Sequence, residues 1–206
     1  MTTLLASLSD KQGLQGDARY EHAHRTYVNL LHASISQLLT VCYSISDHPS
    51  RTTLVLFRYP QSDSNTVGVG HNKHTDIGSL TLLFSEQWGL QVLSPSENKW
   101  RFIAPKPGHA IINVGDSLRF LSGKKFWSCV HRVVPTAETQ LEHRYSIAYF
   151  LRAEDDAQYV DSHGGIVKAK EWHDGKYEVF RQGHEEQERD SVLTGGMEKG
   201  EAIAVT

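Results

Sequence analysis

Two histidines and an aspartate have the residue types and the spacing that suit a metal ion. His74 and Asp76 are two positions apart in the segment HNKHTDIGSLTLLF, immediately before a strand-like run. In extended chain, side chains at positions i and i+2 point to the same face, so both can reach one ion. His71 lies at an odd offset from His74 and is expected to point the other way.

His131, in the later strand-like segment CVHRVV, is the third candidate ligand. Two histidines and one carboxylate cover one face of an octahedral ion and leave positions free, as an oxygen-activating Fe(II) site requires. The alternative is that His74 and Asp76 lie in a solvated turn and that His131 is an ordinary core or surface histidine. An H-x-D pair alone favours that alternative, because the chain contains 12 histidines.

The segment EHRYSIAYFLR offers a candidate anion site. Arg144 and Ser146 share one face of the predicted strand with Ala148 and Phe150. A guanidinium pairs bidentately with a carboxylate, and a nearby hydroxyl adds a hydrogen bond. In the alternative arrangement Arg144 and Ser146 face water and the tyrosines of the strand are buried. Periodicity alone does not separate the two arrangements.

Short β-type runs separated by turn residues make up the chain from Arg51 onward. They are TTLVLFRY, SLTLLF, LQVLS, WRFIA, AIINV, SLRFL, CVHRVV and RYSIAYFL. Many short strands at close intervals predict a β-sandwich or barrel. Asn113 and Asp116 in the segment NVGD are interpreted as turn formers that redirect the chain, and not as part of the chemistry.

Helical patterns flank these strands. An apolar spacing near 3.5 predicts one amphipathic helix over about 17–44, and a second, shorter helix is expected over about 167–182. The charged stretch GHEEQERD follows, and the end GGMEKGEAIAVT is expected to be mobile. We therefore expect a helical N-terminal segment (1–50), a β core (51–155) and a C-terminal extension (156–206).

Composition argues against several other classes of protein. Lys and Arg total 21 against 24 for Asp and Glu, without a long block of one sign, so neither nucleic acid nor an anionic membrane is an expected partner. Cys42 and Cys129 form no C-x-x-C motif, which fits a reducing compartment. No stretch approaches the roughly 20 apolar residues of a membrane span. We expect a cytoplasmic protein, and its oligomeric state is left open.

In combination, these segments resemble the 2-oxoglutarate and Fe(II)-dependent oxygenase superfamily, in particular its isopenicillin N synthase-like branch. The matching pieces occur in the family's order between about Thr53 and Leu151: LVLFRYP, HTD, WGLQV, INVGDSLRFLSGKKFWSCVHRV and RYSIAYF. The combination is highly specific, whereas no single piece is. It implies a double-stranded β-helix, or jelly roll, in which two antiparallel sheets face each other with the metal at one open end.

The resemblance also implies roles for particular residues. His74, Asp76 and His131 correspond to the ligands of Fe(II), and Arg144 with Ser146 corresponds to the pair that binds the far carboxylate of 2-oxoglutarate. The implied reaction consumes O₂ and 2-oxoglutarate, releases succinate and CO₂, and oxidises a small organic substrate by hydroxylation, desaturation or ring closure. The substrate itself is not identified by the sequence.

Three aromatic residues and the N-terminal length complete the comparison. Tyr59, just before the proline of RYP, corresponds to a tyrosine that hydrogen-bonds the other end of the cosubstrate. Phe150 and Trp127 are candidates for the substrate pocket, and both are equally consistent with plain packing. Members of this branch usually have a longer region before the LVLFRYP segment than the roughly 50 residues found here, so the chain is expected to be N-terminally shortened.

Three other functions remain open on the sequence. A truncated, non-catalytic jelly roll would bind a ligand without turnover. An iron oxidase of the same branch would work without 2-oxoglutarate, although Arg144 with Ser146 speaks against it. A zinc hydrolase would use the same three ligands, but two histidines and an aspartate on a jelly roll with an R-x-S strand fit iron better.

Overall fold

Short strands dominate the computed structural model, which describes residues 48–62, 70–137 and 139–197. The predicted helix over 17–44 lies outside the described residues. The strands are β1 (Thr53–Tyr59), β2 (His71–His74), β3 (Leu80–Phe84), β4 (Leu90–Ser94), β5 (Lys99–Phe102), β6 (Ile111–Val114), β7 (His131–Val133), β8 (Arg144–Leu151), β9 (Gln158–Val160) and β10 (Ile166–Lys168). The helices are α3 (Asp116–Leu121), α4 (Ala169–Phe180) and α5 (His184–Arg189). No helix among the described residues is long and apolar enough to cross a membrane.

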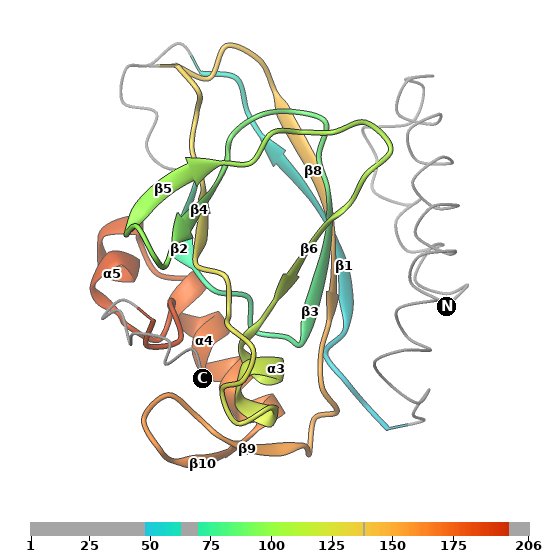
Figure 1. The fold of residues 1–206 in the computed structure, drawn as a ribbon, viewed down its shortest axis with the longest axis vertical. Coiled ribbons are helices and arrows are strands. Elements are labelled where there is room, and N and C mark those ends of the chain that lie inside the picture. The colour runs from blue at the N-terminus through green and yellow to red at the C-terminus, as the bar shows by residue number, and fades with distance from the viewer. Residues whose placement is uncertain (1–47, 63–69, 138, 198–206) are drawn as a thin grey trace. The chain divides into compact units, whose positions relative to one another are not determined.

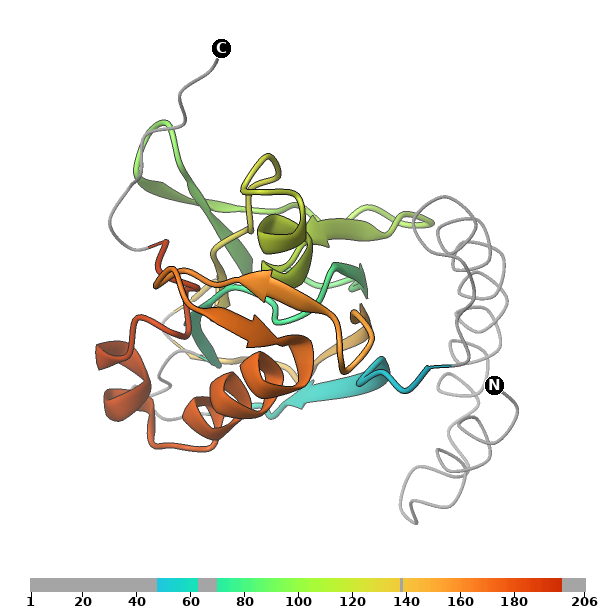
Figure 2. The same cartoon turned by 90° about the horizontal axis from the view of Figure 1, so that it is seen from below.

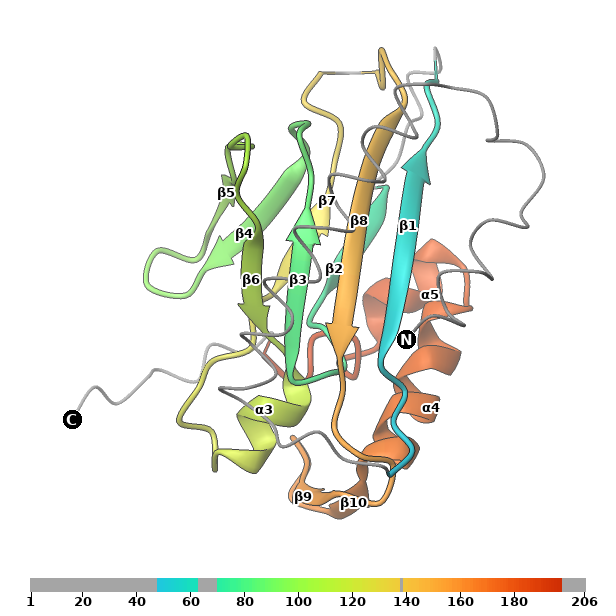
Figure 3. The same ribbon diagram turned by 90° about the vertical axis from the view of Figure 1, so that its right-hand side faces the viewer.

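Eight strands form two four-stranded sheets that face each other (Figure 1). The strand orders are β1-β8-β3-β6 and β2-β7-β4-β5, and all neighbouring pairs are antiparallel. Figure 3 shows the first sheet from its face, with β6, β3, β8 and β1 side by side. Apart from the consecutive strands β4 and β5, neighbouring strands are distant in sequence, so the chain passes repeatedly from one sheet to the other. The mainly β, jelly-roll fold expected from the sequence is confirmed.

The alternation of side chains along β8 decides what faces the interior. This strand lies between β1 and β3 within the first sheet. Because the first sheet faces the second, one face of β8 points into the sandwich. Arg144 and Ser146 are buried, whereas Tyr145 is 48% exposed. The arrangement with the tyrosines inside and Arg144 in water is therefore wrong.

The helix α3 and the β9–β10 hairpin close one end of the sandwich, and α4 leads from there to α5, which lies beside β2 (Figures 1 and 2). A cluster of buried apolar residues joins these elements: Ile77, Phe120, Ala153, Tyr159, Ala169 and Trp172. The rings of Phe120 and Trp172 meet edge to face, with centroids 5.1 Å apart. Since Ile77 follows Asp76 directly, this core fixes the chain just beyond the H-T-D segment.

The segment SLRFL, predicted as a strand, forms most of α3 instead. A run of five residues is too short for its periodicity to separate strand from helix. The helix begins with Asp116, whose negative charge suits the first turn of a helix. Ser117 and Phe120, three positions apart, are buried while Leu121 is exposed, as a helix requires.

The C-terminal region contains more structure than its sequence indicated. The β9–β10 hairpin was not predicted; in its turn, Oδ1 of Asp161 accepts hydrogen bonds from the backbone N–H groups of His163 (2.8 Å) and Gly165 (3.0 Å). The helix α4 lies within the predicted range, and the charged stretch after it contains α5. The end expected to be mobile begins at Gly195, yet Met197 is only 6% exposed. The residues after Met197 lie outside the described part.

Gly115 is a test of this packing, because the chain turns there from β6 into α3 against the backbone of the H-T-D segment. A Cβ on Gly115 would overlap the carbonyl oxygen of Gly78 and lie 2.8 Å from that of Asp76. Backbone atoms cannot swing aside, so Gly115→Ala should lower the free energy of unfolding by about 1–3 kcal/mol in urea titrations.

Gly175→Ala is the matched control, because no atom beyond its chain neighbours and the backbone of its own helix lies within 4 Å of the added Cβ. This glycine lies inside α4, where alanine should stabilise the chain by about 0.5–1 kcal/mol. Equal stability of the Gly115 and Gly175 variants would contradict the close backbone approach at Gly115.

Candidate metal centre and cosubstrate cavity

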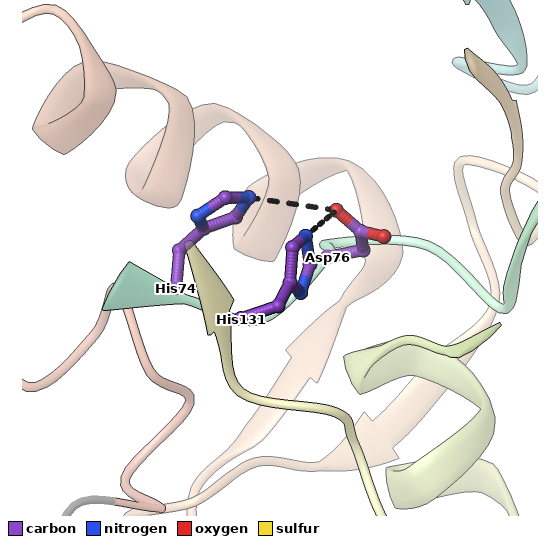
Figure 4. Close-up of side chains that lie close together, drawn as sticks. All are labelled: His74, Asp76 and His131. Carbon is purple, nitrogen blue, oxygen red and sulfur yellow. Dashed lines mark ion pairs between the residues drawn. The ribbon is translucent and has the colours of Figure 1, made fainter. Parts of the chain in front are cut away.

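The side chains of His74, Asp76 and His131 converge on one another (Figure 4). Each offers one ligand atom, and these atoms lie within 4.8 Å of one another. Nε2 of His74 and Nε2 of His131 each lie 3.8 Å from Oδ1 of Asp76. His74 ends β2 and is paired with His131 at the start of β7, while Asp76 follows β2 in the next loop. The three donor atoms can therefore close around one ion.

The two oxygens of Asp76 have different surroundings. Oδ2 accepts hydrogen bonds from the hydroxyl of Thr81 (2.5 Å) and the amide of Asn113 (2.7 Å), whereas Oδ1 faces the two histidines. These bonds fix the carboxylate and leave one oxygen for a metal. The prediction that Asn113 is a turn residue is therefore wrong. Asn113 belongs to β6 and is paired with Thr81 of β3. Strand alternation applied across that pair would have placed both on the inner face.

Both histidines are oriented by a backbone carbonyl. Nδ1–H of His74 donates to the carbonyl of Asn72 (2.6 Å), and Nδ1–H of His131 donates to that of Cys129 (2.9 Å). A carbonyl oxygen only accepts, so these bonds place the proton of each neutral ring on Nδ1 and leave the lone pair of Nε2 for the centre of the cluster. This is how metal-binding histidines are commonly held.

The electrostatics of the cluster favour a positive charge at its centre. Burial and the neighbouring His131 lower the pKa of His74 well below its usual value. Burial acts most strongly on His131 and lowers its pKa, but the carboxylate of Asp76 and the interactions with Cys129 together outweigh it and raise that pKa to about 9. Burial would raise the pKa of Asp76, yet His131, Asn113 and Thr81 together hold it below the ordinary value. A metal cation would replace the proton on His131.

The cluster opens into a cavity of about 230 Å³ that is lined by both sheets. Apolar side chains form much of its wall, among them Leu83, Leu90, Val92, Ile103, Ile111 and Val133. Arg144, Ser146 and Tyr59 line the same cavity. The polar groups expected to bind the metal and the cosubstrate therefore share one space with a largely apolar wall.

Arg144 has an unused donor in this cavity. The side chain is only 2% exposed; Nε donates to the carbonyl of Trp88 (2.9 Å) and Nη2 to the hydroxyl of Ser85 (3.2 Å). Nη1 is buried without a hydrogen-bond partner among the described residues. The guanidinium also lies over the ring of Tyr59, 5.0 Å from its centroid. A buried cationic N–H without a partner is costly, so the site fits an anionic ligand such as a carboxylate.

His71 lies in the cavity as well, contrary to the prediction that it points away. Its ring centroid is 4.8 Å from that of His74, and its Nδ1 forms a 3.4 Å hydrogen bond with the hydroxyl of Tyr59. The pairing of β2 with β7 is irregular between His71 and His74. Such an irregularity breaks the two-residue alternation on which the prediction depended.

The two candidate substrate residues are placed differently. Phe150 lines the cavity. Trp127 is not among the residues that line it and lies half-buried between α3 and β7, so its assignment to the pocket mouth is corrected. Trp127 itself lies in neither a helix nor a strand, and its closeness to His131 in sequence was a poor guide to its position in space.

Known proteins share both the fold and the motifs. Residues 35–153 match the 2OG-Fe(II) oxygenase superfamily. The chain is 63% identical over 157 residues to the oxidoreductase vrtI of Penicillium aethiopicum, covering 76% of this chain and 38% of that protein. It is 52% identical over 200 residues to the 2-oxoglutarate-dependent dioxygenase iboH of Amanita muscaria, covering 96% and 87%.

A solved structure agrees at the level of the fold. The dioxygenase for auxin oxidation in rice superposes with a TM-score of 0.62 at 24% identity, over 81% of this chain and 62% of that one. The jelly-roll fold and the cluster of two histidines and one aspartate in a largely apolar cavity point to one family of enzymes. The sequence matches identify that family. The chain belongs to the 2OG-Fe(II) oxygenase superfamily, which together with the cluster of two histidines and one aspartate implies Fe(II), 2-oxoglutarate and O₂. It spans less than half of vrtI but most of iboH.

The Fe(II) affinities of two variants should distinguish the role of Asp76 from that of His71. Asp76→Ala removes the only carboxylate of the cluster and should abolish tight binding of Fe(II), measured by anaerobic calorimetry. His71→Ala should leave the Fe(II) affinity largely intact, because His71 is not one of the three residues whose donor atoms converge. Equal losses in the two variants would show that the wrong histidine has been assigned.

Proposed function

We propose that this chain is the catalytic core of an Fe(II)- and 2-oxoglutarate-dependent oxygenase that oxidises a small organic substrate. One observation carries the proposal: three converging donor atoms share an apolar cavity with a buried guanidinium that has an unused N–H. A purely structural cluster would not need both. The family membership of the chain supports the same activity.

In this proposal, His74, Asp76 and His131 hold Fe(II). The bound metal, with 2-oxoglutarate and O₂, supplies an oxidative decarboxylation to succinate and CO₂ that is coupled to oxidation of a substrate C–H bond. The protein's own contribution is geometric. Thr81 and Asn113 keep Oδ2 of Asp76 occupied, so that a single oxygen is presented to the metal.

Arg144, Ser146 and Tyr59 are proposed to bind 2-oxoglutarate. The planar guanidinium of Arg144 already uses Nε and Nη2 on protein oxygens, which fixes its orientation and directs Nη1 to the ligand. The hydroxyl of Ser146, two residues along the same face of β8, would add a second contact to the same carboxylate. Tyr59 lies beside Arg144 and also contacts His71, whose ring is next to that of His74, and both contacts support a role for Tyr59 in binding the cosubstrate.

The apolar wall has a separate role in the proposal. Side chains such as Leu83, Ile111 and Phe150 leave few hydrogen-bonding partners for water near the cluster, and they favour a substrate whose reacting part is hydrocarbon. We place the catalytic core in residues 51–155 and propose a cytoplasmic location, based on the cysteine content and the absence of a long apolar run in the sequence.

The decisive experiment measures succinate released from 2-oxoglutarate by the purified chain, loaded with Fe(II) under air. We expect succinate to form in proportion to the 2-oxoglutarate consumed, and His131→Ala to abolish it. Oxygen consumption without 2-oxoglutarate would instead favour the iron oxidase. Binding of 2-oxoglutarate without succinate would favour a non-catalytic jelly roll.

Arg144→Lys should lower the affinity for 2-oxoglutarate and leave the affinity for Fe(II) unchanged. Lysine keeps the charge but loses the planar fork that pairs with a carboxylate. Losing one charge-assisted contact costs about 1.5–3 kcal/mol, so the affinity for 2-oxoglutarate should fall on the order of tenfold to a hundredfold. The measurement is a titration of 2-oxoglutarate into the anaerobic Fe(II) protein, followed by charge-transfer absorption of the chelated keto acid.

Two controls make this titration specific. The Fe(II) affinity of Arg144→Lys should stay unchanged, since Arg144 is not among the converging donors. Arg58→Lys, an exposed arginine on β1, should leave the 2-oxoglutarate midpoint where it is in the unmodified chain. A midpoint unchanged by Arg144→Lys would remove Arg144 from the cosubstrate site.

A further inference from the structure

Lys176 is a fully buried lysine on α4, at 0% exposure. Its ammonium group donates to Oδ2 of Asp116 (2.6 Å) and to the hydroxyl of Thr75 (2.7 Å). Lysine is almost never fully buried unless it is paired, and removing its charge from water is expensive. The position of this side chain therefore calls for an explanation beyond packing.

Thr75 is the middle residue of the H-T-D segment, between the two proposed ligands. Its backbone N–H donates to the carbonyl of Leu193 (2.9 Å), and its hydroxyl contacts Lys176. The next carbonyl, that of Asp76, accepts a hydrogen bond from the backbone N–H of Asp116 (2.8 Å). The backbone that carries the proposed ligands is thus held by α3, α4 and the C-terminal turn.

Asp116 completes this network at the start of α3. Oδ2 also accepts a hydrogen bond from Nε1 of Trp172 (3.3 Å), while Oδ1 is buried with no hydrogen-bond partner in the described part of the chain. Gly195 packs beside that oxygen with φ +58°, and a Cβ there would lie 2.7 Å from Oδ1. No side chain fits in this space, so the C-terminal turn is closely matched to Asp116.

Stability alone is a weak reason for such a pair. Replacing a buried ion pair by apolar residues of similar volume is often neutral or stabilising, because the desolvation of two charges offsets their attraction. What a buried pair can add is a fixed geometry, since each charge must be met by particular partners. Here the third partner is Thr75, one residue from each of two proposed ligands.

We propose that Lys176, paired with Asp116, is a positioning residue for the metal centre: by holding Thr75 it sets the placement of His74 and Asp76. This inference rests on the proposed function and deepens it, because it gives the C-terminal helix α4 a part in metal binding. Lys176 does not touch the metal or the substrate. It acts through the middle residue of the H-T-D segment.

Thr75→Val is the most selective test, since it preserves the shape and the Lys176–Asp116 pair and removes only the hydroxyl, which accepts from Lys176 (2.7 Å) and donates to the carbonyl of Leu193 (3.4 Å). The backbone hydrogen bond from Thr75 to Leu193 remains in this variant. Loss of a contact that orients a ligand typically costs tenfold to a hundredfold in metal affinity, and we expect a decrease of about that size for Fe(II). The measurement is anaerobic calorimetry with the full chain in the absence of 2-oxoglutarate. The midpoint of urea unfolding of the metal-free variant should fall, because one N–H of the buried Lys176 ammonium loses its acceptor. The Fe(II) affinities are therefore compared without urea, where both proteins are folded.

The double variant Lys176→Met/Asp116→Asn removes both charges without leaving either unpaired. We expect it to fold and to lose Fe(II) affinity to a similar extent. Lys168→Met is the matched control: Lys168 directly precedes α4 and forms an exposed ion pair with Asp156, 2.8 Å long. Its removal should leave Fe(II) affinity unchanged.

The outcomes separate this inference from the proposed function. If the unmodified chain fails to bind Fe(II) through Asp76, the proposed function fails and the positioning role fails with it. If the unmodified chain binds Fe(II) and Thr75→Val binds it equally well, only the positioning role is overturned. Thr75→Val decides alone if the double variant does not fold.

Discussion

The site depends on the different surroundings of the two carboxylate oxygens of Asp76. Oδ2 is occupied by Thr81 and Asn113, from neighbouring strands β3 and β6, and Oδ1 is thereby left facing both histidines. A carboxylate free to rotate would present either oxygen or both. Antiparallel pairing of β3 with β6 is therefore a condition for the metal geometry, although neither Thr81 nor Asn113 is a proposed ligand.

The fold could be predicted to the extent that strand alternation reports burial. The face of β8 that carries Arg144, Ser146 and Phe150 lines the cavity, because β8 lies inside a sheet covered by a second sheet. Sequence periodicity could not distinguish this face from the opposite one. The order of the motifs did so, since only the family resemblance linked an R-x-S strand to a site near His131.

Other features lay beyond the sequence because they depend on local irregularity or long-range contact. The i, i+2 argument assumed an extended chain through His74 and Asp76, but β2 ends at His74. Asp76 reaches the cluster from a loop fixed by its β3 and β6 neighbours. His71 enters the cavity through the irregular pairing of β2, and no pattern in the segment HNKHTD marks that irregularity.

The loop that carries Asp76 is fixed by hydrogen bonds from outside its own sheet. Strand β2 cannot fix Asp76 through ladder hydrogen bonds, because pairing with β7 stops at His74. Backbone bonds to Asp116 and Leu193 replace the missing ladder on either side of the loop. Each of these bonds involves α3 or the C-terminal turn, which Lys176 and Asp116 bring together. The helical layer therefore contributes to the proposed metal centre. Its apolar cluster fixes the chain after Asp76, and its buried Lys176–Asp116 ion pair contacts Thr75.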